Sequence, residues 1–261
     1  MSTGGQTLPA GAHVILRGIV GSTIHGVSVS NQDDRDELGI CIEPREYVIG
    51  LRHFETHVWR TQPEGVRSGP GDLDLTIHSL RKFMRLAANG NPTIITLLYL
   101  PEQFICEADK WGRRLIEQRS IMLCRKAGAA FLGYMTAQRE RLEGIRGGQH
   151  GWRQELVDKY GFDTKYAGHL IRLGYQGVEF MRSGVITLPM LPEQRDLVVA
   201  IRTGQVPVND VLTKAGELER DLRDLIDTSP LPEQPDHDAI NRFLVDAYEE
   251  IWREGSARSG A

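Results

Sequence analysis

Residues 14–42 read VILRGIVGSTIHGVSVSNQDDRDELGICI, and this stretch decides the fold that we expect. Two apolar runs, near 13–20 and 37–43, have the length and composition of strands and flank a segment rich in Gly, Asn and Asp. The first run ends in Gly21-Ser22, which predicts a tight turn where the backbone can approach a ligand closely. A helix that starts at such a turn offers free N–H groups to an anion. The turn is therefore a candidate phosphate-binding site.

Three carboxylates follow this turn in the sequence. Asp34 and Asp36 open the second apolar run, and residues two apart in a strand point to the same face of a sheet. Asp74 lies in a third expected strand, near 72–78. Two carboxylates this close repel each other unless a cation lies between them, and hard oxygen ligands beside a phosphate suit Mg²⁺. The pattern predicts a metal site for Mg²⁺, with Mn²⁺ as the other candidate.

Metal-assisted transfer of a nucleotidyl group is the chemistry that this pattern favours. Such a reaction uses two divalent ions about 3.5–4 Å apart and a grip on the triphosphate that aligns the attack. In this interpretation Asp34 and Asp36 hold the nucleotide-bound ion, and Asp36 bridges the two ions. Asp74 completes the second ion and helps to deprotonate the incoming hydroxyl, while Gly21 and Ser22 hold the β- and γ-phosphates.

The residues alone leave alternatives open. An Asp cluster also marks turns and solvated strand ends, and we expect Asp33 in such a turn. Asp72 competes with Asp74 for the third position, although Asp74 leads more directly into the following strand and helix. His53 and His57 are four residues apart and would suit a metal if that segment were helical. The P-loop, dinucleotide-binding and zinc-protease motifs are absent.

Composition and charge restrict the class of protein further. The 261 residues are 40% hydrophobic and 25% charged, as in an ordinary globular protein, and no run of about 18 apolar residues predicts a membrane span. Three cysteines without C-x-x-C spacing favour a reducing, cytoplasmic setting. The net charge is −4, but the charge is unevenly distributed. The middle of the chain, residues 110–182, is basic, with 14 Lys or Arg against 7 Asp or Glu. This middle suits a phosphate-bearing ligand, although solvated helix faces account for it equally well.

Helical periodicity begins near residue 80 and dominates the chain from residue 110 onward. Capping residues and helix breakers divide it into segments. The expected elements are a helix from Leu80 to Asn89-Gly90, a helix begun by Asn91-Pro92, a helical stretch over 111–145 broken by Gly147-Gly148, helices over 164–182 and 209–227, a loop at Pro189 and Pro192, a linker over 229–235, and a last helix that carries Phe243.

These elements predict an α+β fold in two parts. Residues 1–105 would form a catalytic core, a short mixed sheet with flanking helices, and residues 106–261 an all-helical substrate-binding region with a last helix after a Pro-rich linker. Lys165, His169 and Arg172 are spaced so that one helix face presents three groups suited to phosphate. By pattern alone, a solvated basic face is an equal alternative.

Three motifs, taken together and in order, resemble those of predicted nucleotidyltransferases in the DNA polymerase β superfamily. The RNA-ligase-associated nucleotidyltransferase type is the most similar branch, and the resemblance covers residues 13–245. The matching stretches are GSTIHG at 21–26 with DRDELG at 34–39, the run from Asp74 to Pro92 with LRKF at 80–83 and GNP at 90–92, and KYAGHLIR at 165–172.

The resemblance implies a polymerase-β-like fold, Mg²⁺, a nucleoside triphosphate substrate and, by association with RNA ligases, an RNA end as acceptor. Thr23, His25 and Arg35 depart from the residues usual in the family, which bears on the triphosphate grip and base preference. We expect a metal-dependent nucleotidyltransferase that moves an NMP from an NTP to a hydroxyl. Nucleotidylation of a protein or small molecule, or an inactive nucleotide- or RNA-binding module, are the alternatives. The sequence leaves the NTP, the acceptor and the oligomeric state open.

Overall fold

The computed structural model describes residues 6–29, 34–63, 66, 68, 69, 71–146 and 152–259, with only the backbone for 256–259. Asp33, expected in a turn, and the Gly147-Gly148 pair, expected to break a helix, lie outside these residues.

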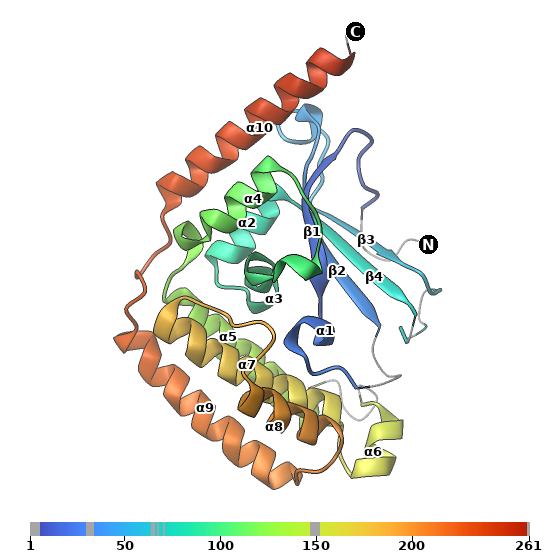
Figure 1. Cartoon of the computed structure of the whole chain (residues 1–261), viewed down its shortest axis with the longest axis vertical. Helices are drawn as coiled ribbons and strands as arrows, with labels where there is room; N and C mark the ends of the chain where they lie inside the picture. Colours follow the sequence, from blue (N-terminus) through green and yellow to red (C-terminus); the bar gives the residue numbers. More distant parts are fainter. Residues whose placement is uncertain are drawn as a thin grey trace.

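A mixed sheet with the strand order β3-β4-β2-β1-β5 forms one part of the molecule (Figure 1). β2 and β4 are parallel, and the other neighbours are antiparallel. The three strands expected from the sequence are confirmed to within two residues, whereas β3 and β5 were not predicted. The strands are β1 (His13–Val20), β2 (Arg35–Ile42), β3 (Thr56–Arg60), β4 (Leu73–Ser79) and β5 (Ile105–Ala108).

Helices pack beside the sheet and then form a separate layer below it in Figure 1. The short α1 lies between the sheet and this lower layer, which α5, α7, α8 and α9 build. The helices are α1 (Ser22–His25), α2 (Leu80–Ala88), α3 (Pro92–Thr96), α4 (Lys110–Glu117), α5 (Lys126–Leu142), α6 (Gln154–Tyr160), α7 (Thr164–Ser183), α8 (Pro192–Arg202), α9 (Val208–Thr228) and α10 (His237–Ser259).

The α2–α3 corner follows its sequence signals closely. The apolar stripe of α2 is buried, with Phe83 fully covered. Gly90 has a φ of 76°, and a Cβ there would collide with the backbone of Ala127, so only glycine fits this helix end. Asn91 caps α3 by accepting hydrogen bonds from two backbone N–H groups, and Pro92 takes the first helical position.

Two expectations for the helical part were wrong. The continuous stretch over 111–145 is interrupted, because α4 ends at Glu117 and α5 begins at Lys126. Pro192 does not lie in a loop but begins α8, a position where the missing N–H of proline costs nothing.

The C-terminal helix returns to the sheet. In α10, the indole Nε1 of Trp252 donates to the backbone oxygen of Glu43 at 2.9 Å, and the Tyr248 hydroxyl donates to the Glu43 carboxylate at 2.8 Å. β5 pairs with β1, so elements after residue 105 complete the sheet. The division of the chain into two parts at residue 105 stays a prediction. No helix within the described residues combines the length and apolar character that crossing a membrane requires.

An ion pair ties the segment before β3 to α2, and its loss at low pH is expected to be measurable. Glu55 accepts hydrogen bonds from Lys82 and Arg85, each at 2.6 Å, and these bonds lower the pKa of Glu55 from 4.5 to about 2. Its stabilising contribution is therefore present above about pH 4.5 and is lost as the pH falls toward 2. At pH 7, Glu55→Gln should lower the free energy of unfolding by about 1 kcal/mol, a difference that shrinks below pH 4.5. Urea unfolding of the wild type and Glu55→Gln between pH 7 and pH 3 measures this difference in stability. A difference that did not change with pH would contradict the assigned ion pair.

Candidate active site

Four residues in register across the sheet define the site. Val20 of β1 lies opposite Asp36 of β2, Asp36 lies beside Asp74 of β4, and Asp74 lies opposite Arg60 of β3. Residues at the same register position on neighbouring strands project from the same face, so the side chains of Asp36, Asp74 and Arg60 meet. Asp34 immediately precedes β2.

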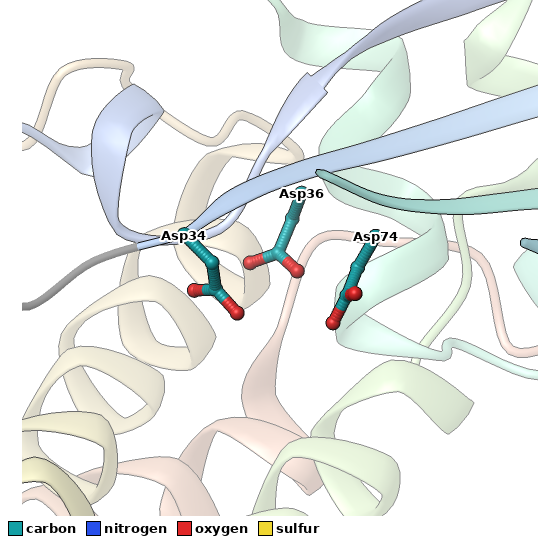
Figure 2. A group of neighbouring side chains, drawn as sticks. All are labelled: Asp34, Asp36 and Asp74. Atoms are coloured by element: carbon teal, nitrogen blue, oxygen red, sulfur yellow. The ribbon is translucent and has the colours of Figure 1, made fainter. Parts of the chain in front are cut away.

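The three predicted carboxylates come together. Asp34, Asp36 and Asp74 each offer an oxygen, and these oxygens lie within 4.8 Å of one another. Figure 2 shows the side chains pointing to one side of the strands, toward the helical layer. Asp72, the rival for the third position, is used elsewhere: its carboxylate accepts from the Gly69 N–H at 2.9 Å and from the Thr61 hydroxyl at 3.0 Å.

Gly21 allows the turn after β1 to lie against this cluster. It has a φ of 77°, and a Cβ there would collide with the carboxylate of Asp36. Ser22 follows as the first residue of α1. The predicted turn therefore brings backbone directly beside the carboxylates, as close approach to a bound phosphate requires.

Arg60 holds Asp74 in a defined orientation. Its guanidinium donates to both carboxylate oxygens at 3.0 Å, and the Ser68 hydroxyl donates to one of them at 2.8 Å. Burial favours the neutral form of Asp74, but these hydrogen bonds and the charge of Arg60 outweigh it and lower the pKa of the carboxyl. Asp74 is thus ionised at neutral pH and is a weak proton acceptor, which suits a metal ligand better than a general base.

A cavity of about 410 Å³ connects the carboxylates to the helical layer. Asp36 and Asp74 line it from the sheet, and His169 and Arg172 line it from α7. Lys165, the third predicted residue of this helix face, acts on His169 through its charge. His169 and Arg172 thus border the same cavity as the acidic cluster, whereas Lys165 is not among the described residues that line it.

Arg172 has no acidic partner in the part of the chain that the structure describes. Its guanidinium contacts His25 Nε2 at 2.7 Å and the Gln176 side-chain oxygen at 2.9 Å. Burial, together with the charge of Arg202, lowers the pKa of Arg172 to about 10. A cation in this position is stabilised by a bound anion.

The surroundings of His169 are also strongly cationic. Burial lowers the pKa of His169 well below its ordinary value, and the charges of four cations add to this effect. The same two causes, burial and the charge of Arg172, lower the pKa of His25. Both imidazoles are therefore neutral at pH 7. The cations that act on His169 are Arg172, Arg141, Arg153 and Lys165.

Sequence reasoning missed Arg60 and the contact of His25 with Arg172. Arg60 could not be found because its strand was not predicted, and its position opposite Asp74 depends on the register of β3. His25 was noted only as a departure from a family motif. The alternative of a metal held by His53 and His57 required that this segment be helical. His57 instead lies in strand β3, and His53 precedes that strand outside any helix.

Converging carboxylates beside a Gly-Ser turn on a short mixed sheet, followed by a helical region, are the arrangement of polymerase-β-like nucleotidyltransferases. The chain matches the model of the RNA repair pathway DNA polymerase beta family over residues 7–246, and it belongs to that family.

Two further comparisons are more distant. An uncharacterized 38.9 kDa protein of Enterobacteria phage T4, from the nrdC-mobD intergenic region, is 24% identical over 139 residues, 51% of this chain. The matched part spans only 39% of the phage protein. A crystal structure of a nucleotidyltransferase-like protein from Exiguobacterium sibiricum 255-15 covers 91% of this chain and 74% of its own, at 13% identity and a TM-score of 0.31.

Proposed function

We propose that this protein is a divalent-metal-dependent nucleotidyltransferase that moves an NMP from an NTP to a hydroxyl at an RNA end. The hydroxyl oxygen bonds to the α-phosphorus, the bond from that phosphorus to the bridging oxygen of the β-phosphate breaks, and pyrophosphate leaves. The observation that carries the proposal is the convergence of Asp34, Asp36 and Asp74 at a cavity that His169 and Arg172 border from the opposite side. Carboxylates on one wall and the Arg172 guanidinium on the other suit a metal-bound polyphosphate.

The acidic cluster fits Mg²⁺ or Mn²⁺ by the chemistry of its donors. The ligands are all carboxylate oxygens, and on one octahedral Mg²⁺ such oxygens lie about 3–4 Å apart. The oxygens of this cluster lie within 4.8 Å of one another, which is close to that range. Small side-chain rotations would therefore bring all three carboxylates onto one ion. Ions held there would neutralise charge on the transferring phosphate and activate the incoming hydroxyl.

In this proposal, other residues of the chain bind the triphosphate and orient the metal ligands. Arg172 binds a phosphate oxygen of the NTP, and Gly21 and Ser22 present backbone N–H groups to the triphosphate. Asp36, in the middle of the row, is the carboxylate best situated to serve two ions. Arg60 orients Asp74 by bonding both of its oxygens.

Family membership and charge support an RNA acceptor. The family is described by its place in RNA repair, and the excess of cations over residues 110–182 suits a polyphosphate strand. The cytoplasmic setting expected from the cysteine content stays part of this proposal.

The proposal is tested by incubating the protein with each α-labelled NTP, Mg²⁺ or Mn²⁺, and a mixed RNA pool. Label should move to RNA with the wild type and not with the Asp34→Ala/Asp36→Ala double variant. Transfer to RNA should also weaken steeply with ionic strength, as small-acceptor transfer would not. Label on the protein itself, on a small molecule or on nothing would contradict an RNA acceptor.

Arg172→Gln is expected to raise the dissociation constant for a non-hydrolysable NTP analogue roughly 10- to 100-fold, the worth of a charge-assisted bond to phosphate. The free energy of unfolding should change little, because the removal of a cation that burial disfavours offsets the loss of its hydrogen bonds to His25 and Gln176. Calorimetric binding and thermal unfolding measure the two effects.

The matched control is Arg182→Gln, on the same helix, whose guanidinium forms a 3.6 Å ion pair with Asp221 at the exposed surface. This change should affect neither quantity appreciably. A loss of stability in Arg172→Gln with unchanged NTP affinity would mean that Arg172 only packs α7 against His25.

A further inference from the structure

A second cavity, of about 610 Å³, opens on the face of α5 that α7 borders. His169 lines both this cavity and the one beside the acidic cluster, so the two cavities share this residue. We call it the α5 cavity. Its lining includes Gly133, Tyr134, Ala137, Gln138, Arg141 and His169.

Gln138 lines the α5 cavity and has a side-chain oxygen without a partner. The residue is 4% exposed, and its Oε1 is buried without a hydrogen bond from any residue in the described part of the chain. A buried amide left unpaired is costly, and such groups are nearly always satisfied in proteins by protein, water or ligand. The Gln138 amide, which can both donate and accept, therefore points to a ligand with a hydrogen-bonding edge.

Tyr134 supplies a flat aromatic surface beside this amide, one helical turn away. The residue is 37% exposed, and its phenolic oxygen accepts a hydrogen bond from Asn91 Nδ2 at 2.8 Å. This bond fixes the ring from the α3 side of the active site. A held and partly exposed ring is suited to stacking a nucleobase.

Arg141 supplies charge at the far end of the same helix face. Its guanidinium forms no ion pair with a described residue, and its charge contributes to lowering the pKa of His169. The phosphates of the NTP have Arg172 and the acidic cluster on the other side of His169. Arg141 is thus available for a different phosphate.

We propose that the α5 cavity holds the terminal nucleotide of a single-stranded polynucleotide, the acceptor of the transfer reaction, with the base on Tyr134 and Gln138 and a strand phosphate on Arg141. The inference rests on the proposed function in assigning the strand as acceptor. The alternative occupant is the base of the NTP, which requires no second phosphate contact and leaves Arg141 without a role.

The test measures fluorescence anisotropy of labelled single-stranded RNA and DNA oligonucleotides with the full chain. Gln138→Leu keeps the side-chain volume and removes the amide, so the oligonucleotide dissociation constant should rise about tenfold. Affinity for a non-hydrolysable NTP analogue should not change. The melting temperature should hold or rise, because an unpaired buried amide is replaced by an apolar group. A Gln138 that served only the fold would instead lower it.

Gly133→Leu blocks the cavity by a different route. A Cβ at Gly133 has no neighbour within 4 Å, so the new side chain enters the cavity and not the core. Oligonucleotide binding should fall at least tenfold. The matched control is Gly216→Leu in α9, where a Cβ meets only the flexible end of Arg220 at 3.9 Å, and binding should stay as in the wild type.

The outcomes separate the two proposals. If transfer to RNA occurs but neither cavity variant weakens oligonucleotide binding, the α5 cavity is not the acceptor site. If both variants weaken NTP binding instead, the cavity holds the NTP base and the inference is wrong. If oligonucleotides bind in the α5 cavity but no label is transferred, the polynucleotide site holds and the proposed reaction fails. No oligonucleotide binding by the wild type would overturn the inference directly.

Discussion

Asp36→Asn is expected to lower the rate of nucleotidyl transfer at least about a thousandfold. Asp36 lies between Val20 and Asp74 in the register of the sheet, and its carboxylate contributes to an oxygen cluster no wider than 4.8 Å. Asparagine keeps the shape but removes a charge and one anionic oxygen. Losing a bridging ligand costs several kcal/mol of charge stabilisation in the transition state. Initial rates with labelled NTP at saturating Mg²⁺ measure the effect.

The stability of the same variant separates a functional role from a structural one. Removing one of three clustered carboxylates relieves repulsion, so metal-free Asp36→Asn should melt no lower than the metal-free wild type. The rise in melting temperature that Mg²⁺ gives the wild type should shrink or vanish. Asp246→Asn, at an exposed position of α10, makes the same chemical change remote from the site and should alter neither measurement. A wild-type rate in Asp36→Asn would remove the basis of the metal site.

The parts of the site that local sequence signals specify were predictable. A Gly-Ser turn after an apolar run, and two aspartates at strand spacing, both act over a few residues. Gly21 and the pair Asp34 and Asp36 could therefore be assigned before the fold was known. Asp74 was chosen over Asp72 by its position before a strand and helix, and the structure brings its carboxylate into the cluster while that of Asp72 fixes a loop.

The parts that depend on tertiary pairing were not predictable. β3 is short and half-exposed, so its sequence THVWR lacks the alternation that marks a strand with one buried face. Arg60 therefore gave no signal, although it becomes the direct neighbour of Asp74 once β3 pairs with β4. The contact of His25 with Arg172 joins residues 147 positions apart, and no local pattern specifies it.

The helical layer illustrates a different limit. The spacing of Lys165, His169 and Arg172 fixed their shared helix face but not what that face would meet. Solvent exposure and ligand contact were equal alternatives until the packing of α7 against α1 was known. In the structure the backbone oxygen of His25 accepts from Met190 at 3.2 Å, and Arg202 donates to the backbone oxygen of Val27. These contacts hold α1 against the helical layer and put His169 and Arg172 across from the carboxylates.

Asp74→Ala is expected to abolish transfer, by at least about a thousandfold in kcat, while the dissociation constant for the NTP changes less than about threefold. The proposed nucleotide-bound ion is held by Asp34 and Asp36, and the triphosphate by Arg172, so none of the NTP contacts requires Asp74. In the proposed mechanism the Asp74 carboxylate holds the second ion, which would activate the incoming hydroxyl. Single-turnover rates and calorimetric binding of a non-hydrolysable analogue measure the two quantities separately.

Asp72→Ala is the matched control, because it removes a carboxylate two residues earlier in the sequence. Among the described residues, that carboxylate accepts only from the Gly69 N–H and the Thr61 hydroxyl. It should leave both kcat and NTP affinity near those of the wild type. Asp74→Asn keeps the size of the side chain and removes its charge; its single amide oxygen can still accept from Arg60 Nη2 and Ser68, while the bond from Arg60 Nε is lost. If Asp74→Asn is as inactive as Asp74→Ala, the anionic oxygens carry the function, as a metal ligand requires. Equal losses of kcat and NTP affinity in Asp74→Ala would mean that Asp74 belongs to the nucleotide site, and the division of roles among the three carboxylates would be wrong.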